Sequence, residues 1–294
     1  MPTGILLLDK PSGLSSNAAL QRVRRAFGAE KAGHVGSLDP LATGMLPICL
    51  DEATKVAGEL LEGRKCYRFE AALGRRTATG DTEGAVVEER PVPPFGREEL
   101  DGVLKAFVGE RQQTPPMYSA LKRGGKPLYR LARAGVEVER APRAIRIDRL
   151  ELLAVSAKLL ELEMVCSKGT YVRTVAEEIA VDLGTCGHVA SLRRLYVEPF
   201  AAEPMVSLEA VLATAPGGAL PALLPADRAL GHLPAMALDA NDAARLRRGQ
   251  AAQARAAHEH GRCRLYDAQG RFFGIGECTA EGLVRPRRLF NLAG

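Results

Sequence analysis

Apolar and polar positions alternate along this chain in a way that predicts short strands interleaved with separate helices. The apolar run 4–10 (GILLLDK) is typical of a short buried strand, and residues 15–17 (SSN) supply cap chemistry for a helix to about Phe27. Segment 145–167 predicts a β-hairpin of two long strands. Residues 97–107 predict a helix, because their apolar side chains have helical spacing at Leu100, Val103, Leu104 and Phe107.

Further elements are predicted between these segments. Residues 67–74 and 85–89 are expected to be strands joined by the Thr- and Gly-rich turn TATGDTEG. Paired strands with separate helices indicate an α+β fold whose mixed sheet is largely antiparallel. The remaining predicted elements are strands at 45–50 and 192–197 and helices at about 52–62, 128–134 and 169–183.

The chain is expected to contain two domains. Gly- and Pro-rich residues occur at 214–221 and 231–234, and beyond them short strands alternate with turns. We therefore predict a larger domain over 1–230 and a small β domain over 235–294. Within the larger domain, the Pro-, Gly- and Arg-rich residues at about 111–142 form a candidate insertion.

Positive charge is concentrated in two regions. The 294 residues carry a formal net charge of +5 at pH 7. Residues 111–149 hold ten Lys and Arg against three Asp and Glu, and residues 235–294 hold ten against six, which gives +7 and +4 and leaves about −6 for the remainder. Two basic regions on an acidic body are typical of a protein that grips a polyanion at two places. A solvated basic surface is the alternative interpretation.

Several classes of protein are not expected. The chain has neither a charged leader followed by an apolar run nor an apolar run of about 18 residues, so we expect neither export nor membrane insertion. Its six cysteines include no C-x-x-C pair and indicate buried thiols in a reducing cytoplasm. Dispersed histidines give little support for a metal site, and no G-x-G-x-x-G or G-x-x-x-x-G-K-[ST] motif is present.

The stretch 33–44 (GHVGSLDPLATG) contains the strongest candidate for chemistry, Asp39. Its glycines and Pro40 are typical of a loop of fixed shape, and its apolar residues are expected to anchor that loop to a core. A carboxylate on a short anchored loop can be presented at a fixed angle to a substrate. The structural alternative is a turn in which Asp39 caps backbone amides before Pro40.

Segment 33–44 resembles the signature of the TruB family of tRNA pseudouridine synthases, in which the Asp of G-x-L-D-P-x-A-T-G is catalytic. The resemblance extends over nearly the whole chain, in family order. It recurs in LLLDKPSGLSSN (6–17), KCYRFEAALGRRTATGDTEG (65–84), QTPPMYSALKRGGKPLYRLARAG (113–135), CSKGTYVRTVAEEIAVDLG (166–184) and HVASLRRLYVEPF (188–200). It implies a catalytic domain with a thumb insertion, followed by a small PUA-like β-barrel.

The resemblance assigns catalytic roles to Asp39, Arg173 and Tyr67. Asp39 would help to cleave the glycosidic bond, either as a nucleophile or by taking a proton from the sugar. Arg173, from G-T-Y-x-R-T, would hold the buried carboxylate ionised through a two-point bond, although pairing with Glu177 one helical turn away is its structural alternative. Tyr67 would stack on the extruded uracil and serve the late deprotonation at C5, whereas half-buried packing is the alternative for a strand tyrosine.

Further residues are implied around these three. His34 resembles a family histidine that fills the space left by the flipped base, and Val35 stands where many relatives carry Thr. Tyr171 and Leu192 are expected to line the pocket, with plain core packing as the alternative for Leu192. The remaining implied residues are Lys10 as an aid to Tyr67 or to the loop backbone, and Asp81 as a group that orients Arg173.

Phosphate and shape recognition of RNA is implied at two places. The thumb would close on the T loop through Lys122, Arg123, Lys126 and Arg130. The C-terminal segment would hold the acceptor stem through Arg285, Arg287 and Arg288.

Together these features predict a cytoplasmic, monomeric isomerase that converts uridine 55 of the tRNA T loop to pseudouridine without a cofactor, a metal or a guide RNA. Two alternatives are kept. One is a guide-RNA-dependent relative that modifies ribosomal RNA, against which the intact P-L-Y-x-L-A-R-x-G thumb counts. The other is an RNA-folding chaperone whose basic surfaces matter more than catalysis.

Overall fold

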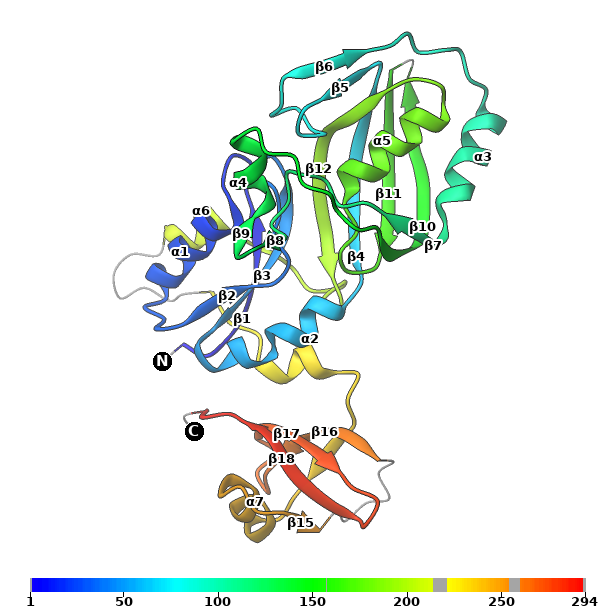
Figure 1. Ribbon diagram of the computed structural model, residues 1–294. Helices are drawn as coiled ribbons and strands as arrows, with labels where there is room; N and C mark the ends of the chain where they lie inside the picture. Colours follow the sequence, from blue (N-terminus) through cyan, green and yellow to red (C-terminus); the bar gives the residue numbers. More distant parts are fainter. Residues whose placement is uncertain (1, 157, 214–220, 254–259, 293–294) are drawn as a thin grey trace.

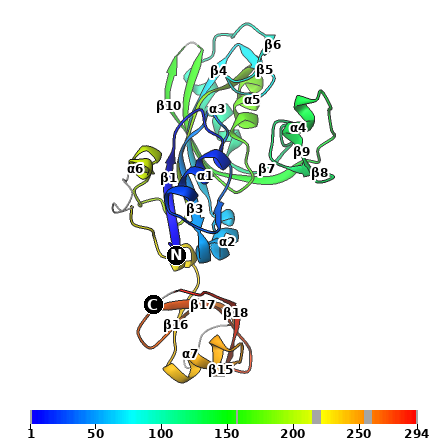
Figure 2. The same cartoon turned by 90° about the vertical axis from the view of Figure 1, so that its left-hand side faces the viewer.

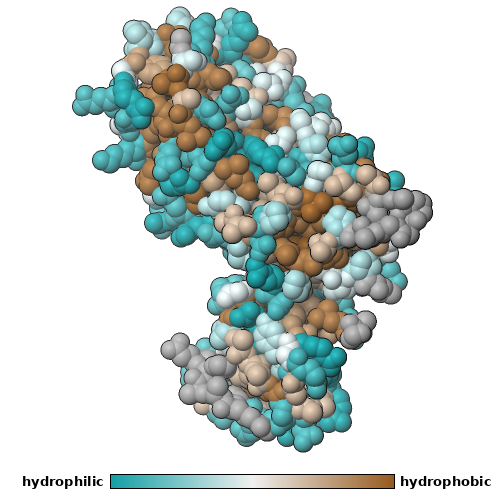
Figure 3. Space-filling view, turned by 180° about the vertical axis from the view of Figure 1, so that it is seen from behind, coloured by the Kyte–Doolittle hydropathy of each residue, from teal (hydrophilic) through white to brown (hydrophobic). Residues whose placement is uncertain are grey.

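The computed structural model describes residues 2–156, 158–213, 221–253 and 260–292. They form a larger N-terminal body and a smaller C-terminal one, joined by a narrow waist (Figures 1 and 3). Most of the Gly- and Pro-rich stretch expected near the boundary, 214–220, lies outside the described residues.

The larger body is built on a nine-stranded mixed sheet with the order β13-β1-β3-β12-β4-β11-β10-β7 and with β2 paired to β3. The β1–β13 and β3–β12 pairs are parallel and the other pairs are antiparallel, so the predicted α+β class is confirmed. The strands are β1 (Gly4–Lys10), β2 (Ala32–His34), β3 (Thr43–Leu50), β4 (Lys65–Leu73), β7 (Gly109–Gln113), β10 (Arg143–Ser156), β11 (Leu159–Cys166), β12 (Gly187–Val197) and β13 (Val206–Ser207).

Apolar side chains cover both faces of this sheet. On one face α5, α3 and α1 pack over buried strand residues such as Phe69 and Leu162. On the other face Ile5, Met45 and their neighbours pack under short helices near the waist. The helices of the described chain are α1 (Ser16–Ala26), the 3-10 helix η1 (Asp51–Val56), α2 (Ala57–Glu62), α3 (Arg97–Phe107), α4 (Leu128–Arg133), α5 (Val172–Asp182), α6 (Leu208–Leu212), the 3-10 helix η2 (Ala226–Leu230) and α7 (Ala240–Arg247).

Most predicted elements are confirmed, and three differ. The helix expected at 52–62 is a 3-10 turn followed by α2, and the helix expected from residue 169 begins at Val172. The strand expected at 85–89 does not pair with the strand expected at 67–74. Instead, β6 (Val86–Glu89) pairs with the three-residue β5 (Arg75–Thr77) in a separate ribbon. The turn TATGDTEG therefore joins β5 to β6, and β4 is free to pair with β11 and β12.

The segment 114–142 projects from the sheet as a separate arm, seen at the right in Figure 2. It contains the short hairpin β8 (Lys122–Arg123) and β9 (Lys126–Pro127), followed by α4. The arm leaves the sheet after β7 and returns to it at β10, so it is an insertion between two neighbouring strands.

The smaller body contains a five-stranded sheet with the order β14-β16-β17-β18-β15. Its own buried cluster includes Leu246, Leu265 and Val284. The predicted strands of the tail are confirmed, and the sheet comprises β14 (Ala235–Ala237), β15 (Ala252–Gln253), β16 (Gly261–Tyr266), β17 (Phe272–Cys278) and β18 (Leu283–Leu289).

Candidate active site

Asp39 lies on the loop 35–42, which crosses from β2 to β3, and contacts on both sides of it fix the loop. The Ser16 hydroxyl accepts from the Leu38 amide at 2.7 Å and donates to the Leu38 carbonyl at 2.9 Å. The Pro40 carbonyl accepts from the Gly13 amide at 2.9 Å and from Lys10 Nζ at 3.2 Å. Because Leu38 and Pro40 flank Asp39, its backbone is pinned on both sides.

Arg173, in the first turn of α5, connects Asp39 to two other segments. Its side chain is 4% exposed, and Nε lies 3.0 Å from Asp39 Oδ2. Nη1 donates to the Thr79 carbonyl and Nη2 to the Tyr118 carbonyl, each at 2.7 Å. The expected two-point bond to Asp39 is therefore wrong in form, because both terminal nitrogens are directed at backbone carbonyls. The structural alternative for Arg173, an ion pair with Glu177, is not found either, because the ion pairs of Arg173 among the described residues are with Asp39 and Asp81.

Asp81 lies next to Arg173 and to Thr79. It is 2% exposed, and its Oδ2 lies 3.8 Å from Arg173 Nη1. Oδ1 accepts from the Glu83 amide at 3.1 Å and from the Thr79 hydroxyl. Asp81 thus contacts both Arg173 and Thr79, the residue whose carbonyl accepts from Arg173.

The Asp39–Arg173 pair opens onto a cavity of about 600 Å³. Three further predicted residues, Tyr67, Tyr171 and Leu192, line the same cavity. Residues 120–121 at the root of the arm close one side of it, next to the Tyr118 carbonyl that Arg173 holds. Asp39, the apolar Leu192 and the rings of Tyr67 and Tyr171 therefore line one space that can take a planar base.

Burial and charge act in opposite directions on Asp39. Desolvation raises the pKa of its carboxyl above the ordinary 3.8, and Asp81 adds to that rise. The Arg173 and Lys10 charges lower the pKa again. Desolvation of a carboxylate strengthens its basicity, and a neighbouring guanidinium keeps it available as an anion, so the pair is suited to acid–base or nucleophilic work.

Tyr67 sits in the middle of β4 and is 9% exposed. Burial raises the pKa of its phenol, while the Arg194 guanidinium lowers it. The neutral hydroxyl is thus the favoured form, and the Arg194 charge partly offsets the effect of burial.

Lys10 and His34 lie beside the cavity and outside its lining. Lys10 is fully buried and donates to the carbonyls of Pro11, Leu14 and Pro40, so it serves the loop backbone, as one of the two sequence interpretations held. Burial lowers the pKa of this amine to about 8. His34 ends β2, and its buried Nδ1 has no hydrogen-bond partner among the described residues.

The predicted RNA-contacting cations lie apart from this site. Those of the arm are exposed: Lys122, Arg123, Lys126 and Arg130. On β18, Arg285 is exposed, Arg287 pairs with Glu277 at 3.0 Å, and Arg288 donates to the Lys55 carbonyl at 3.0 Å. Arg288 therefore also ties the smaller body to the larger one.

Sequence reasoning missed three cations that line the cavity, Lys65, Arg143 and Arg194. Arg143 lies over the Tyr171 ring at 4.8 Å, and Lys65 donates to carbonyls at the end of α2. A signal for two of them was present, since Lys65 precedes Tyr67 and Arg194 follows Leu192 by two residues. Strand periodicity places such pairs on one face.

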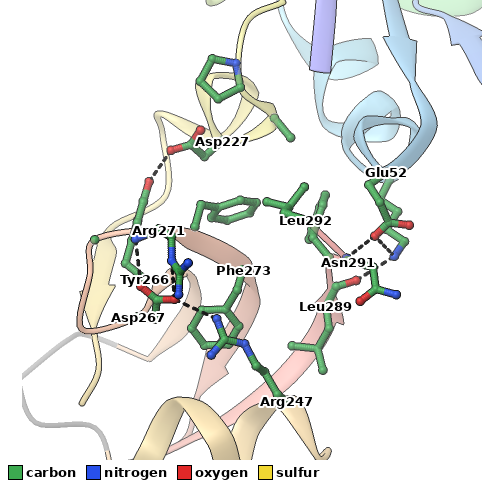
Figure 4. A pocket seen from close by; sticks show the side chains of 16 residues that line it. Glu52, Asp227, Arg247, Tyr266, Asp267, Arg271, Phe273, Leu289, Asn291 and Leu292 are labelled. Carbon is green, nitrogen blue, oxygen red and sulfur yellow. Dashed lines mark hydrogen bonds and ion pairs between the residues drawn. The ribbon is translucent and has the colours of Figure 1, made fainter. Parts of the chain in front are cut away.

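A second, larger cavity of about 920 Å³ lies between the two bodies (Figure 4). Its polar groups are engaged with one another: Asp267 accepts from Arg247 and Arg271, and the Tyr266 hydroxyl donates to Asp227. None of the candidate site residues lines it. These paired groups are typical of an interface between two parts of a protein. The smaller cavity therefore remains the candidate active site.

Three family models match most of the chain, between residues 24 and 290. A model of the TruB family pseudouridylate synthase N-terminal domain matches residues 24–172. Two C-terminal models, described as tRNA pseudouridylate synthase B C-terminal domain and as pseudouridine synthase II TruB, C-terminal, match 173–230 and 234–290.

Two curated relatives show the extent of the likeness. The chain is 50% identical over 293 residues to tRNA pseudouridine synthase B of Stutzerimonas stutzeri, covering 98% of this chain and 96% of the relative. It is 48% identical over 292 residues to tRNA pseudouridine synthase B of Coxiella burnetii, with coverage of 98% and 94%.

Solved structures share the fold at lower identity. A crystal structure of a Cbf5-Nop10-Gar1 complex superposes with a TM-score of 0.74 at 23% identity, over 98% of this chain and 85% of the other. An H/ACA ribonucleoprotein bound to a substrate RNA containing 2′-deoxyuridine gives 0.75 at 20% identity, over 99% and 86%. Near-complete coverage by family models and by relatives at about half identity makes this chain a member of the TruB family of pseudouridylate synthases.

Proposed function

We propose that the chain isomerises uridine 55 in the T loop of tRNA to pseudouridine. The observation that carries this proposal is the Asp39–Arg173 pair at the wall of a cavity that Tyr67 also lines. The curated relatives are tRNA pseudouridine synthases, which supports tRNA as the substrate. The product is an isomer of the substrate, so the reaction balances without an oxidant, a reductant or a group donor.

Asp39 begins the reaction. As the N1–C1′ bond breaks, its carboxylate either attacks the sugar as a nucleophile or removes a sugar proton. Both routes need the ionised carboxylate, and Arg173 favours that form. A deuterium isotope effect from the sugar of the target uridine separates them, because only the second route breaks a sugar C–H bond.

The later steps use the other side chains of the site. The freed uracil turns within the cavity against Leu192 and the Tyr67 ring, and its C5 joins C1′. Tyr67 then serves the removal of the C5 proton. His34 acts before these steps by filling the space of the extruded base, which offsets part of the few kcal/mol that base flipping costs.

Recognition of tRNA is assigned to the two basic regions. The arm, which projects from the sheet (Figure 2), acts as a thumb that closes on the T stem-loop through its exposed cations. Residues 235–294 act as a PUA-like β-barrel domain that meets the acceptor stem, and residues 1–230 form the catalytic domain. The enzyme works as a cytoplasmic monomer without a guide RNA.

Mapping the modified nucleotide tests this proposal. Unmodified tRNA incubated with the protein alone should acquire pseudouridine at position 55, and tRNA with cytidine at that position should acquire none. The Asp39→Asn variant should be inactive, whereas Asp101→Asn on the exposed face of α3 should behave as wild type. Modification at another position, or only after a guide RNA is added, would overturn the assignment.

The exposed cations of the arm also favour a second activity, the folding of RNA. An RNA-folding chaperone and an isomerase can coexist in one protein, and Asp39→Asn separates them. If this variant still promotes tRNA folding, the basic surfaces have a function that is independent of the reaction.

A further inference from the structure

Arg194, in β12, is a buried cation without a carboxylate partner. It is 1% exposed, and among the ion pairs of the described residues none includes it, whereas its neighbour Arg193 pairs with Asp9 at 2.8 Å. An unpaired charge is costly to bury, so its retention beside a catalytic cavity calls for a function.

The contacts of Arg194 join three segments of the site. Its Nε donates to the Met45 carbonyl of β3 at 2.7 Å, and Nη2 donates to the Gly36 carbonyl, at the start of the Asp39 loop, at 2.9 Å. Gly36 makes room for the guanidinium, because a Cβ there would lie 3.2 Å from Nη1. Gly44 has a φ of 98°, and a Cβ there would lie 2.1 Å from the Arg194 carbonyl oxygen.

The third segment is the strand that carries Tyr67. Arg194 lies directly opposite Tyr67 in the β4–β12 register, and both side chains line the same cavity. Arg194 from β12, Cys166 from β11 and Asp39 from the loop act on the charge of the phenol. Of these, Arg194 is the group that favours the phenolate, while Cys166 and Asp39 oppose it.

We propose that Arg194 is a positioning residue for removal of the C5 proton, acting through the hydroxyl of Tyr67. The inference rests on the proposed function and deepens it. In this step the C5–H bond breaks and its electron pair restores the ring double bond. The Tyr67 oxygen accepts the C5 proton as its hydroxyl passes its own proton to water, the Arg194 charge stabilises the phenolate character that develops, and N1 takes a proton from water.

The C5 deuterium isotope effect on the single-turnover rate distinguishes this role from a merely structural one, because a structural role would not change it. Single-turnover rates are measured with tRNA whose uridines carry either hydrogen or deuterium at C5. In Arg194→Lys the charge remains and the forked contact is lost, so the rate should fall about 10- to 100-fold. The C5 isotope effect should rise above that of the wild type, because proton removal becomes rate-limiting, and tRNA affinity should be unchanged.

Arg193→Lys is the matched control, since Arg193 is the next residue on the same strand and points to the opposite face. It should retain the wild-type rate and isotope effect. Should Arg194→Lys fail to fold, Tyr67→Phe replaces it, because this variant removes only the hydroxyl through which Arg194 acts, and its C5 isotope effect should rise as well.

A slower Arg194→Lys with an unchanged isotope effect would overturn the inference, as would a wild-type rate in that variant or a Tyr67→Phe without a raised isotope effect. Absence of pseudouridine with the wild-type protein would instead overturn the proposed function, on which the role of Arg194 depends.

Discussion

At the residue scale, Asp39 is held between burial, which favours its protonated form, and the Arg173 and Lys10 charges, which favour its carboxylate. Asp81 is the nearby carboxylate that shifts the balance toward protonation. The net result is a pKa above the ordinary 3.8. A carboxyl in this state is a stronger base than a surface aspartate.

This balance predicts the acid limb of the pH–rate profile. Activity needs ionised Asp39, so the single-turnover rate should fall as the pH drops through a value above 3.8. Asp81→Asn removes a repulsion and should move this limb to lower pH. Asp101→Asn, which is remote from the site, should leave the limb in place. A limb that does not move in Asp81→Asn would contradict the electrostatic account.

Arg173 is predicted to affect catalysis far more than binding. Arg173→Ala removes the cation beside Asp39 and leaves the Thr79 and Tyr118 carbonyls without their donor. We expect the single-turnover rate to fall by about two orders of magnitude or more, with tRNA affinity little changed. Parallel binding and rate measurements check this. A loss confined to affinity would show that Arg173 acts on the RNA.

At the element scale, the Asp39 loop depends on the N-terminus of α1. Ser15 caps the helix by accepting from the Ala18 amide at 3.1 Å, whereas the adjacent Ser16 bonds both backbone groups of Leu38. Two neighbouring serines therefore have separable tasks, one in helix stability and one in loop position.

These serines supply a matched pair of variants. Ser15→Ala should lower the free energy of unfolding by about 1 kcal/mol and leave the turnover rate unchanged. Ser16→Ala leaves two buried backbone groups of Leu38 unpaired, costs about 1–3 kcal/mol, and should also lower the rate. Thermal melts and single-turnover assays of both variants check this, and equal rates in the two would argue against loop positioning by Ser16.

Local patterns and spatial junctions were not equally predictable. The helix at 97–107 and the hairpin at 145–167 follow from periodicity, which is a local property, and both are confirmed. The β5–β6 ribbon was missed because a three-residue strand carries too little alternation to be distinguished from a turn. The Arg194 contacts depend on β12 lying between β3 and β4, an order that no local pattern contains.

Asp39 and Arg173 were identified by their motifs, and the structure places them 3.0 Å apart from segments more than 130 residues distant in sequence. The sequence did not predict which groups the two terminal nitrogens of Arg173 would contact. That depends on where the backbones at Thr79 and Tyr118 pass, which the tertiary packing of the β5–β6 turn and the arm decides.

At the scale of the whole molecule, the smaller body is attached through the waist. Arg262 holds Glu59 through two contacts of 2.6 and 2.8 Å, and Lys55 Nζ donates to the Leu289 carbonyl at 2.8 Å. No helix of the described chain is both long and apolar enough to cross a membrane. The basic arm projects from the larger body and the basic tail forms the smaller one, so the two basic regions lie on separate parts of the molecule (Figure 2).

This arrangement predicts that tRNA affinity falls steeply with salt, because phosphate contacts release counterions. Replacing Lys122, Lys126 and Arg130 together with alanine should flatten the slope of log affinity against log salt by up to about 3 units. Lys105→Ala, on α3, is the control and should leave the slope unchanged. A flat response in the wild type would show that neither basic region contacts phosphate.

The most direct test of the central claim follows hydrogen at C5. Unmodified tRNA with tritium on uracil C5 is incubated with wild-type protein or Asp39→Asn, in the presence of a chelator and without nucleotide or reductant. The account predicts tritium release by the wild type alone, with both proteins binding the tRNA. Binding without release by either protein would contradict it and leave RNA folding as the activity of this chain.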